Sequence, residues 1–183
     1  MQDSQEYKLI QEMKQGDIPA FEALLRLYEK PIYNHLRRIV GIDDASDCAQ
    51  ETFMKLYTHR TAIDPKSRLK NWLYKVATNT AYDLLRKKKR LFETALSPED
   101  ENICETNLPE AAYSTMEQEI LVQDIEAALL KIPVHYRSIL LLYYREGFSY
   151  EELADLLSMP LNTVKTHLRR SKEALKQTMK SYG

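Results

Sequence analysis

The amino-acid sequence predicts an all-α protein made of two small helical domains. Glycine accounts for only 4 of the 183 residues, and Leu, Glu, Lys and Ala, which favour helices, are plentiful. Apolar residues recur every three or four positions over most of the chain, without the alternation that is typical of strands. Between two such regions lies an acidic stretch without periodicity, which is typical of a linker between domains.

The first predicted domain, residues 1–90, opens with two amphipathic helices. The first helix is short and ends at Gly16, because glycine favours a turn. The second carries an apolar stripe through residues 21–39 and ends at Gly41. Pro31 lies within this stripe, and because proline lacks a backbone donor we expect a kink or a break there.

Two more helices complete the first predicted domain. The third begins near Asp43 and has an apolar side that includes Cys48. An irregular stretch, Thr58–Ser67, follows it. The fourth helix extends from about Leu69 into a run of five cations that ends at Arg90.

Residues 91–115 form the predicted linker. Between Leu91 and Glu119 there are eight acidic residues and no Lys or Arg, so the rest of the chain has 26 Lys and Arg against 19 Asp and Glu, a net charge of +7. Basic charge on the folded domains indicates a polyanionic partner. A flexible coil of about 25 residues spans roughly 25–30 Å, which lets two domains bind separate sites on one long ligand.

The second predicted domain, residues 116–183, begins with two further helices. One runs from about Met116 to Ile132, and the next begins at Pro133 and ends at Gly147. Two short helices joined by a tight turn follow in residues 148–172. Asn162 is placed to cap the second of them, because its side chain can accept a hydrogen bond from an unpaired amide.

These last two helices have the pattern of a helix-turn-helix. The first has an apolar face made of Leu153, Ala154 and Leu157. In the second, the residues predicted to face inward are Val164, Leu168, Ser171 and Leu175. Those predicted to face outward, where they can donate to base edges and phosphates, are Lys165, Thr166, Arg169 and Arg170. DNA is therefore the leading candidate partner, and the alternative is a structural helical pair with a solvated basic face.

Several kinds of site are not indicated by the sequence. Cys48 and Cys104 lack the spacing of metal ligands, and there is no Gly-rich phosphate loop or nucleophile–base pair. We therefore expect no metal, no cofactor and no enzymatic activity, with Cys48 in the core and Cys104 exposed. No apolar run approaches ~18 residues and no signal peptide is evident, so we expect a cytoplasmic, soluble protein without membrane insertion.

Two motifs in the first domain carry a family resemblance. The first, within Asp44–Tyr57, has the form Asp-x-x-Gln-Glu-x-Phe, and the second, within Leu69–Lys89, reads Trp-Leu-Tyr-x-x-Ala-x-Asn-x-x-x-Asp-x-x-Arg-Lys. Together with Ile132–Arg137 and the helix-turn-helix, they resemble bacterial extracytoplasmic-function (ECF) sigma factors of the sigma-70 family, over nearly the whole chain. The resemblance implies that residues 1–90 are sigma region 2 and residues 116–183 are region 4.

The resemblance implies that the first motif binds the coiled coil of the β′ subunit of RNA polymerase. Polar groups ringed by apolar anchors suit a protein interface better than a catalytic site. The residues expected there are Asp47, Gln50, Glu51, Phe53, Met54 and Tyr57. The alternative is a capped, solvated helix. Cys48 departs from the larger aliphatic residue usual in the family, which changes the core and leaves the docking face intact.

The second motif is expected to bind the −10 promoter element, where one base is extruded into a pocket of the domain. Asn79 is the best base-contacting candidate. Trp72 and Tyr74 could stack on bases, although the helical spacing of both also fits packing in the core. For Trp72 the core position is favoured. The expected phosphate contacts are Arg86, Lys87, Lys88, Lys89 and Arg90. In the family the loop Thr58–Ser67 selects the base.

The helix-turn-helix is expected to bind the −35 element. The residues that match the family's positions are Lys165, Thr166, His167, Arg169, Arg170 and Lys172. Arg170 stands where the family almost always has Arg. His167 and Arg169 depart from the usual residues, so these two positions are where we expect this chain's own promoter preference to lie.

The resemblance thus implies an alternative sigma factor whose partners are core RNA polymerase, through the β′ coiled coil and the β flap, promoter DNA and an anti-sigma factor. Two other functions stay open on the residues alone. A stand-alone transcriptional regulator would bind a DNA duplex specifically without polymerase. A nucleic-acid-processing enzyme would cleave DNA in the presence of a divalent metal.

Overall fold

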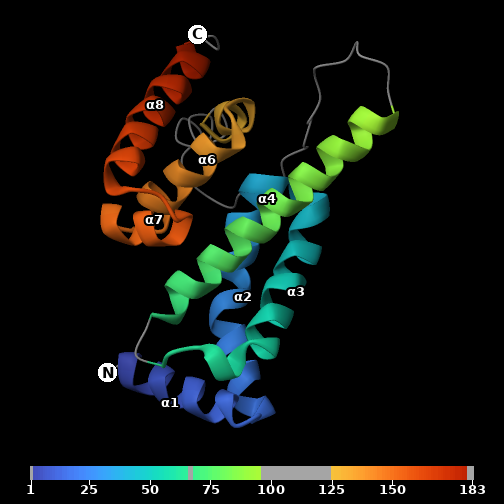
Figure 1. Cartoon of the computed structure of the whole chain (residues 1–183), viewed down its shortest axis with the longest axis vertical. Helices are drawn as coiled ribbons and strands as arrows, with labels where there is room; N and C mark the ends of the chain where they lie inside the picture. The colour runs from blue at the N-terminus through green and yellow to red at the C-terminus, as the bar shows by residue number, and fades with distance from the viewer. Residues whose placement is uncertain (1, 66–67, 96–124, 181–183) are drawn as a thin grey trace, which may run out of the picture. The chain divides into compact units, whose positions relative to one another are not determined.

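The computed structural model describes residues 2–65, 68–95 and 125–180. These residues form helices and turns, with no strand among them, which confirms the all-α prediction. The chain divides into two compact units, Met1–Asp100 and Glu101–Gly183. The helices of both units are labelled in Figure 1.

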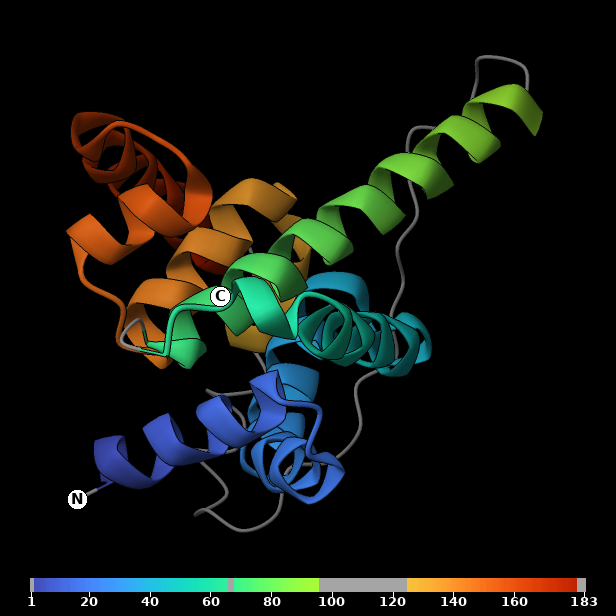
Figure 2. The same ribbon diagram turned by 60° about the horizontal axis from the view of Figure 1, so that its bottom comes forward.

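The first unit is a helical bundle. Its helices are α1 (Gln2–Lys14), α2 (Ile18–Val40), α3 (Ile42–Thr58), the short 3₁₀ helix η1 (Arg60–Ala62) and α4 (Leu69–Ala95). α2, α3 and α4 pack against one another, and α1 lies across the N-terminal end of α2 (Figures 1 and 2). The four predicted helices of this region are therefore present.

Local signals explain where α2 begins and ends. The side chain of Asp17 accepts a hydrogen bond from the Ala20 amide at 2.8 Å, which caps the helix N-terminus. Gly41 has φ of 89°, a conformation that glycine adopts without strain, so a single residue separates α2 from α3. α2 is continuous through Pro31, so the break that we considered there does not occur. Burial of Ile32 and Leu36 on the next turns stabilises the helix beyond the proline.

The predicted end of the fourth helix is wrong by five residues. α4 continues to Ala95, whereas the sequence placed the start of the linker after Arg90. That boundary rested on the change in charge, and a charge change does not stop a helix. The first proline after Arg90 is Pro98, so nothing in residues 91–95 prevents helix formation.

Apolar side chains from all four helices form the core of the first unit. The large residues that are fully buried there are Ile10, Met13, Leu24, Ile32, Leu36, Ile39, Leu56, Leu69, Leu73 and Tyr74. Polar residues also lie in this core: the buried His35 ring is 3.1 Å from the hydroxyl of the buried Thr78 and meets the Tyr74 ring edge-on. Cys48 is also buried, as predicted.

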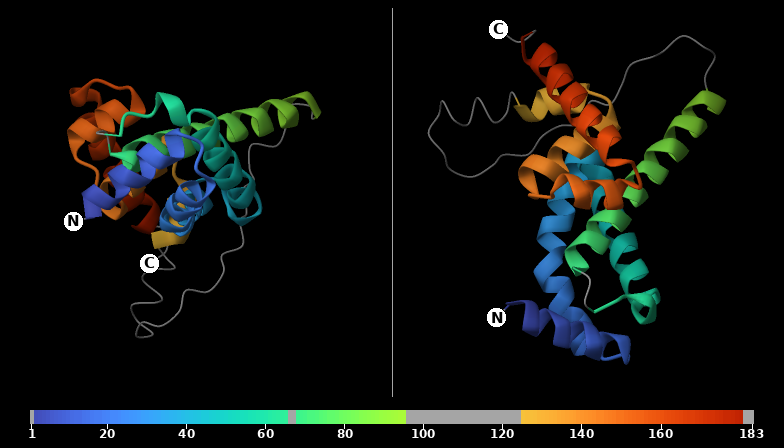
Figure 3. Two further views of the ribbon diagram at one scale, coloured as in Figure 1. Left: turned by 90° about the horizontal axis from the view of Figure 1, so that it is seen from below. Right: turned by 60° about the vertical axis from the view of Figure 1, so that its left-hand side comes forward.

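The second unit contains a helical segment at 125–131, α6 (Val134–Leu140), the π-helical turn η2 (Leu141–Arg145), α7 (Tyr150–Leu157) and α8 (Leu161–Lys180). The helix predicted from Pro133 to Gly147 is present, with its last turn in π form. The predicted start of the preceding helix at Met116 lies outside the described residues. Figure 3 shows the short α7 set beside the long α8.

A buried arginine joins α6 to the segment before it. The Arg137 guanidinium donates hydrogen bonds to the carbonyl oxygens of Leu129 (2.8 Å), Leu130 (2.6 Å) and Ile132 (3.4 Å). These carbonyls end the helical segment 125–131 and have no further turn of helix to bond to. Arg137 therefore stabilises the corner between the two helices.

The turn between α7 and α8 differs from the prediction in one detail. Ser149 and Glu152 form a capping box at the start of α7. Ser158 is the C-cap residue that follows Leu157, and its left-handed φ of 53° reverses the chain. The amide of Val164 donates to the carbonyl of Pro160 at 3.1 Å, so the hydrogen bonding of α8 begins at Pro160. Asn162 is therefore inside the helix, and its predicted role as the cap is wrong.

Candidate functional site

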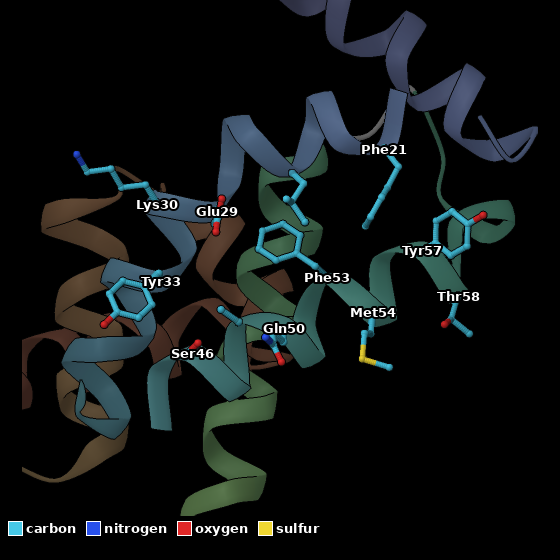
Figure 4. A pocket seen from close by; sticks show the side chains of 12 residues that line it. Phe21, Glu29, Lys30, Tyr33, Ser46, Gln50, Phe53, Met54, Tyr57 and Thr58 are labelled. Atoms are coloured by element: carbon cyan, nitrogen blue, oxygen red, sulfur yellow. The ribbon is translucent and has the colours of Figure 1, made fainter. Parts of the chain in front are cut away.

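An open groove of about 750 Å³ lies between α2 and α3 in the first unit. Its lining is mainly apolar and aromatic. The lining residues are Phe21, Leu25, Glu29, Lys30, Tyr33, Ser46, Ala49, Gln50, Phe53, Met54, Tyr57 and Thr58. Figure 4 shows Phe21 and Tyr57 at one end and Tyr33 toward the other. The rings of Phe21 and Tyr57 meet edge-on at 5.1 Å, which fixes the wall at that end.

Four of the six predicted docking residues line this groove, namely Gln50, Phe53, Met54 and Tyr57. Met54 is 70% exposed, a large apolar side chain in water, as expected of an interface anchor. Phe53 is only 5% exposed, so it forms the floor of the groove and is not a projecting anchor.

The other two predicted docking residues, Asp47 and Glu51, are exposed on α3 outside the groove lining. They leave two carboxylates on the same helix as the apolar anchors. Such an arrangement suits a partner that presents cations around an apolar contact.

The α2 wall of the groove was missed by sequence reasoning. The sequence predicts a single apolar stripe through residues 21–39, and the structure divides it between the core and the groove. Leu24 and Ile32 are fully buried, whereas Phe21 and Leu25 remain partly exposed in the groove. The stripe is wider than one buried face needs, and this excess width is the signal that could have found the groove.

Cys48 lies on α3 next to Asp47 and is buried. Burial raises the pKa of its thiol to about 11, and the nearby carboxylates of Asp44, Glu51 and Asp47 add to this effect. Because the thiolate is the reactive form, Cys48 is an unreactive core residue at neutral pH.

The exposed surface of α4 carries an amide and a set of cations. Asn79 is exposed, as its predicted role requires. The cations of the predicted phosphate patch are also exposed: Arg86, Lys87, Lys88, Lys89 and Arg90. Arg86 pairs with Asp83 at 3.2 Å, and Lys88 pairs with Asp44 of α3 at 2.6 Å.

The two aromatic candidates on α4 differ from each other. Tyr74 is 1% exposed and packs against His35, so its ring has no face for a base and the predicted stacking role is wrong. Its neighbours on α2 decide this, and they cannot be read from the periodicity of α4 alone. Trp72 is partly exposed, which leaves both core packing and stacking possible.

Of the four residues of α8 that were predicted to face inward, three are buried and Leu175 is partly exposed. Val164, Leu168 and Ser171 are buried. The predicted contacts that are exposed are Lys165, Thr166, Arg169, Arg170 and Lys172. Arg169 pairs with Glu173 one turn further along the helix at 2.8 Å, and the Thr166 hydroxyl donates to the carbonyl of Asn162 at 2.9 Å.

His167 does not lie with the exposed residues of α8. Its ring is partly buried and lies 5.9 Å from the His135 ring and 6.1 Å from the Tyr136 ring, both on α6. The prediction that His167 faces DNA with the other residues is therefore corrected to a position on the flank of α8. Partial burial, together with the neighbouring His167, lowers the pKa of His135.

The described residues contain neither a metal site nor a membrane-spanning helix. Within the described residues no group of His, Cys, Asp and Glu side chains is arranged to hold a metal ion. In the same ranges no helix has the length and apolar character needed to cross a membrane.

Comparisons with known proteins match both units. Residues 24–91 match the family "Sigma-70 region 2" and residues 123–175 match "Sigma-70, region 4". The chain is 33% identical over 182 residues to "ECF RNA polymerase sigma factor SigW" of Bacillus subtilis, covering 94% of this chain and 96% of the relative. It is 30% identical over 174 residues to "ECF RNA polymerase sigma-E factor" of Haemophilus influenzae, covering 91% of each.

A solved structure supports the fold. The sigma factor RpoE from Bartonella quintana, solved in complex with the anti-sigma factor NepR, aligns with a TM-score of 0.75 at 24% identity over 89% of this chain and 98% of RpoE. The chain therefore belongs to the extracytoplasmic-function group of the sigma-70 family and is an alternative sigma factor of RNA polymerase.

Proposed function

We propose that three surfaces of this sigma factor carry its steps in initiation. The groove between α2 and α3 binds core RNA polymerase, the exposed face of α4 binds the −10 element, and the exposed face of α8 binds the −35 element. The observation that carries the proposal is the groove: apolar side chains are left open to water beside exposed carboxylates in a chain whose other large apolar residues are mostly buried.

The chemistry of the groove supports a helical protein partner. Met54, Phe21 and Tyr57 offer apolar area, and residues of these types are enriched in interface centres. Asp47 and Glu51 on the adjacent surface favour a partner with Arg or Lys at matching positions. The family resemblance identifies this partner as the β′ coiled coil.

The α4 surface suits the separated strand of the −10 element. Holding a base outside the duplex costs a few kcal/mol of stacking, which contacts to the base and phosphates must offset. The exposed Asn79 amide can donate to and accept from a base edge. The cations at 86–90 neutralise phosphates and so supply affinity with little sequence information.

The α8 surface suits the major groove of the −35 element. Its buried side is occupied by the core, so only the face with Lys165, Arg169 and Arg170 is open to DNA. Arg170 is the candidate for reading a base, since an arginine can donate two hydrogen bonds to guanine. The flap of the β subunit remains the second expected polymerase contact for this unit.

A double substitution tests the docking proposal. Gln50→Ala with Glu51→Arg replaces the amide and reverses one carboxylate, and we expect co-purification with core polymerase to be lost, because truncating a few central residues removes most of an interface's binding energy. Circular dichroism should show the helical fold retained.

The matched control is Glu12→Arg, which makes the same charge reversal in the exposed Lys8–Glu12 pair of α1. It should co-purify like the wild type. Undiminished co-purification of the double variant would contradict the docking assignment, while leaving membership of the family untouched.

The remaining expectations follow from the family. Sigma factors are transcription initiation factors, and we propose that this one has no enzymatic activity of its own and acts in the cytoplasm. The structural relative RpoE was solved with the anti-sigma factor NepR, and CnrH was solved with the cytosolic domain of CnrY. We propose that an anti-sigma factor also holds this chain, through the surfaces that bind polymerase and DNA.

A further inference from the structure

Lys55 of α3 is bound to two helices at once. Its ammonium group lies 2.6 Å from the Glu51 carboxylate, one turn earlier on α3, and 3.0 Å from the Thr80 hydroxyl on α4. The Lys55 side chain is 37% exposed, so it lies at the boundary between the seam of the two helices and water. A lysine ammonium has three donors, and these two contacts use two of them.

The two partners of Lys55 belong to different surfaces. Glu51 is one of the carboxylates proposed to bind polymerase. Thr80 is 2% exposed and directly follows Asn79, the exposed amide proposed to read the −10 element. Lys55 therefore connects the docking helix to the promoter-binding helix through one side chain.

The contact with Thr80 distinguishes Lys55 from an ordinary surface lysine. An exposed ion pair between residues four apart on one helix contributes little, and Lys8–Glu12 in α1 is such a pair. In contrast, the bond from Lys55 reaches a buried hydroxyl of another helix. The Asp44–Lys88 pair joins the same two helices eight residues further along α4, about 12 Å away.

We propose that Lys55 is a positioning residue that couples polymerase docking at Glu51 to the presentation of Asn79 by α4. This inference rests on the proposed docking and −10 surfaces. In the free protein the Lys55 ammonium divides its hydrogen bonds between the Glu51 carboxylate and the Thr80 hydroxyl. A cation of the partner that binds Glu51 competes for the carboxylate, and the Lys55 ammonium then bonds more strongly to Thr80 and holds α4 for strand separation.

The experiment uses holoenzyme reconstituted from the full chain and core RNA polymerase, on a promoter identified by sequencing its own transcripts. Affinity for core polymerase is measured by anisotropy of labelled sigma factor, and promoter opening by permanganate reactivity at saturating holoenzyme. The variants are Lys55→Met, which removes both contacts, Thr80→Val, which removes only the contact on α4, and Lys55→Arg, which can keep both. Lys8→Met is the matched control.

For Lys55→Met and Thr80→Val we expect the affinity for core polymerase to change by less than about fivefold. The reason is that the exposed ion pair between Lys55 and Glu51 contributes little, and Glu51 itself is retained. We expect opening to fall about tenfold, a typical size for coupling between two sites. Lys55→Arg should restore most of the opening, and Lys8→Met should match the wild type in both measurements.

Wild-type opening by both Lys55→Met and Thr80→Val would overturn the inference. So would a loss confined to core affinity, because Lys55 would then only support Glu51. Failure of the docking proposal has a different signature: the Gln50→Ala, Glu51→Arg chain would bind polymerase normally, whatever the Lys55 variants do.

Discussion

The helices α3 and α8, proposed to bind polymerase and the −35 element, present their polar residues in different ways. On α3, Asp44 and Lys55 extend to α4, where they contact Lys88 and Thr80. On α8, the exposed Arg169 pairs within its own helix, with Glu173 one turn further along. A substitution of Asp44 or Lys55 should therefore also affect α4, the proposed −10 surface, whereas a substitution of Arg169 should have a local effect.

The largest expected effect is a loss of stability in the second unit, with no change in the stability of the first. Arg137→Met removes the donor from two buried carbonyl groups and one part-buried carbonyl group, and we expect it to lower the free energy of unfolding of the second unit by ~3 kcal/mol. Trp72 is the only tryptophan of the chain and lies in the first unit. Urea unfolding followed by tryptophan fluorescence should therefore match the wild type, while circular dichroism shows an earlier transition. A shifted fluorescence midpoint would show that the two units are coupled.

The next prediction sharpens the local character of α8. Arg170→Ala should cost ~1–3 kcal/mol of discrimination against altered −35 sequences if Arg170 reads a base. The measurement is run-off transcription from the cognate promoter and from single-base variants. Lys172→Ala is the comparison, since a phosphate contact should weaken all sequences equally. Equal losses for Arg170→Ala on every sequence would make Arg170 a phosphate contact too.

These contrasts explain how much could be read from the sequence. The buried stripe of Val164, Leu168 and Ser171 was predicted correctly because it depends only on the periodicity of one helix. The positions of Tyr74 and His167 depend on which neighbouring helix each one meets, and the periodicity of a single helix does not contain that information. The bond from Lys55 to Thr80 was missed for the same reason.

The predicted helix ends were wrong for a different reason, because signals that favour different ends lie close together in the sequence. The carbonyl of Pro160 accepts the first hydrogen bond of α8, two residues before Asn162, although asparagine is the better capping residue by type. At the end of α4, charge composition and helix propensity disagreed, and propensity prevailed as far as Ala95. Both errors move an end by a few residues and leave the predicted faces unchanged.

A smaller effect tests whether α3 and α4 share charge. Asp44→Asn removes the carboxylate that pairs with Lys88, and we expect the stability cost to be ~1 kcal/mol, because the Lys88 side chain is 53% exposed and that of Asp44 is 21% exposed. The charge of Lys88 then becomes more available to phosphates. Affinity for the non-template single strand, measured by anisotropy at several salt concentrations, should rise, with a salt slope steeper by about 0.7. An unchanged slope would mean that Lys88 does not contact phosphate.

The smallest expected effect concerns the contact between His167 of α8 and His135 of α6. Because the pKa of His135 is lowered in the folded protein, a proton binds the unfolded chain more readily, and the second unit should lose stability as the pH falls below about 6.5. His167→Gln removes the neighbouring charge and should reduce this loss without abolishing it, since burial is the larger cause. Thermal unfolding by circular dichroism between pH 5 and pH 8 measures it, with the exposed His59→Gln of the first unit as control. If His167→Gln leaves the pH dependence unchanged, the charge of His167 does not affect His135. His167 would then remain a candidate for contacting DNA, as the sequence predicts.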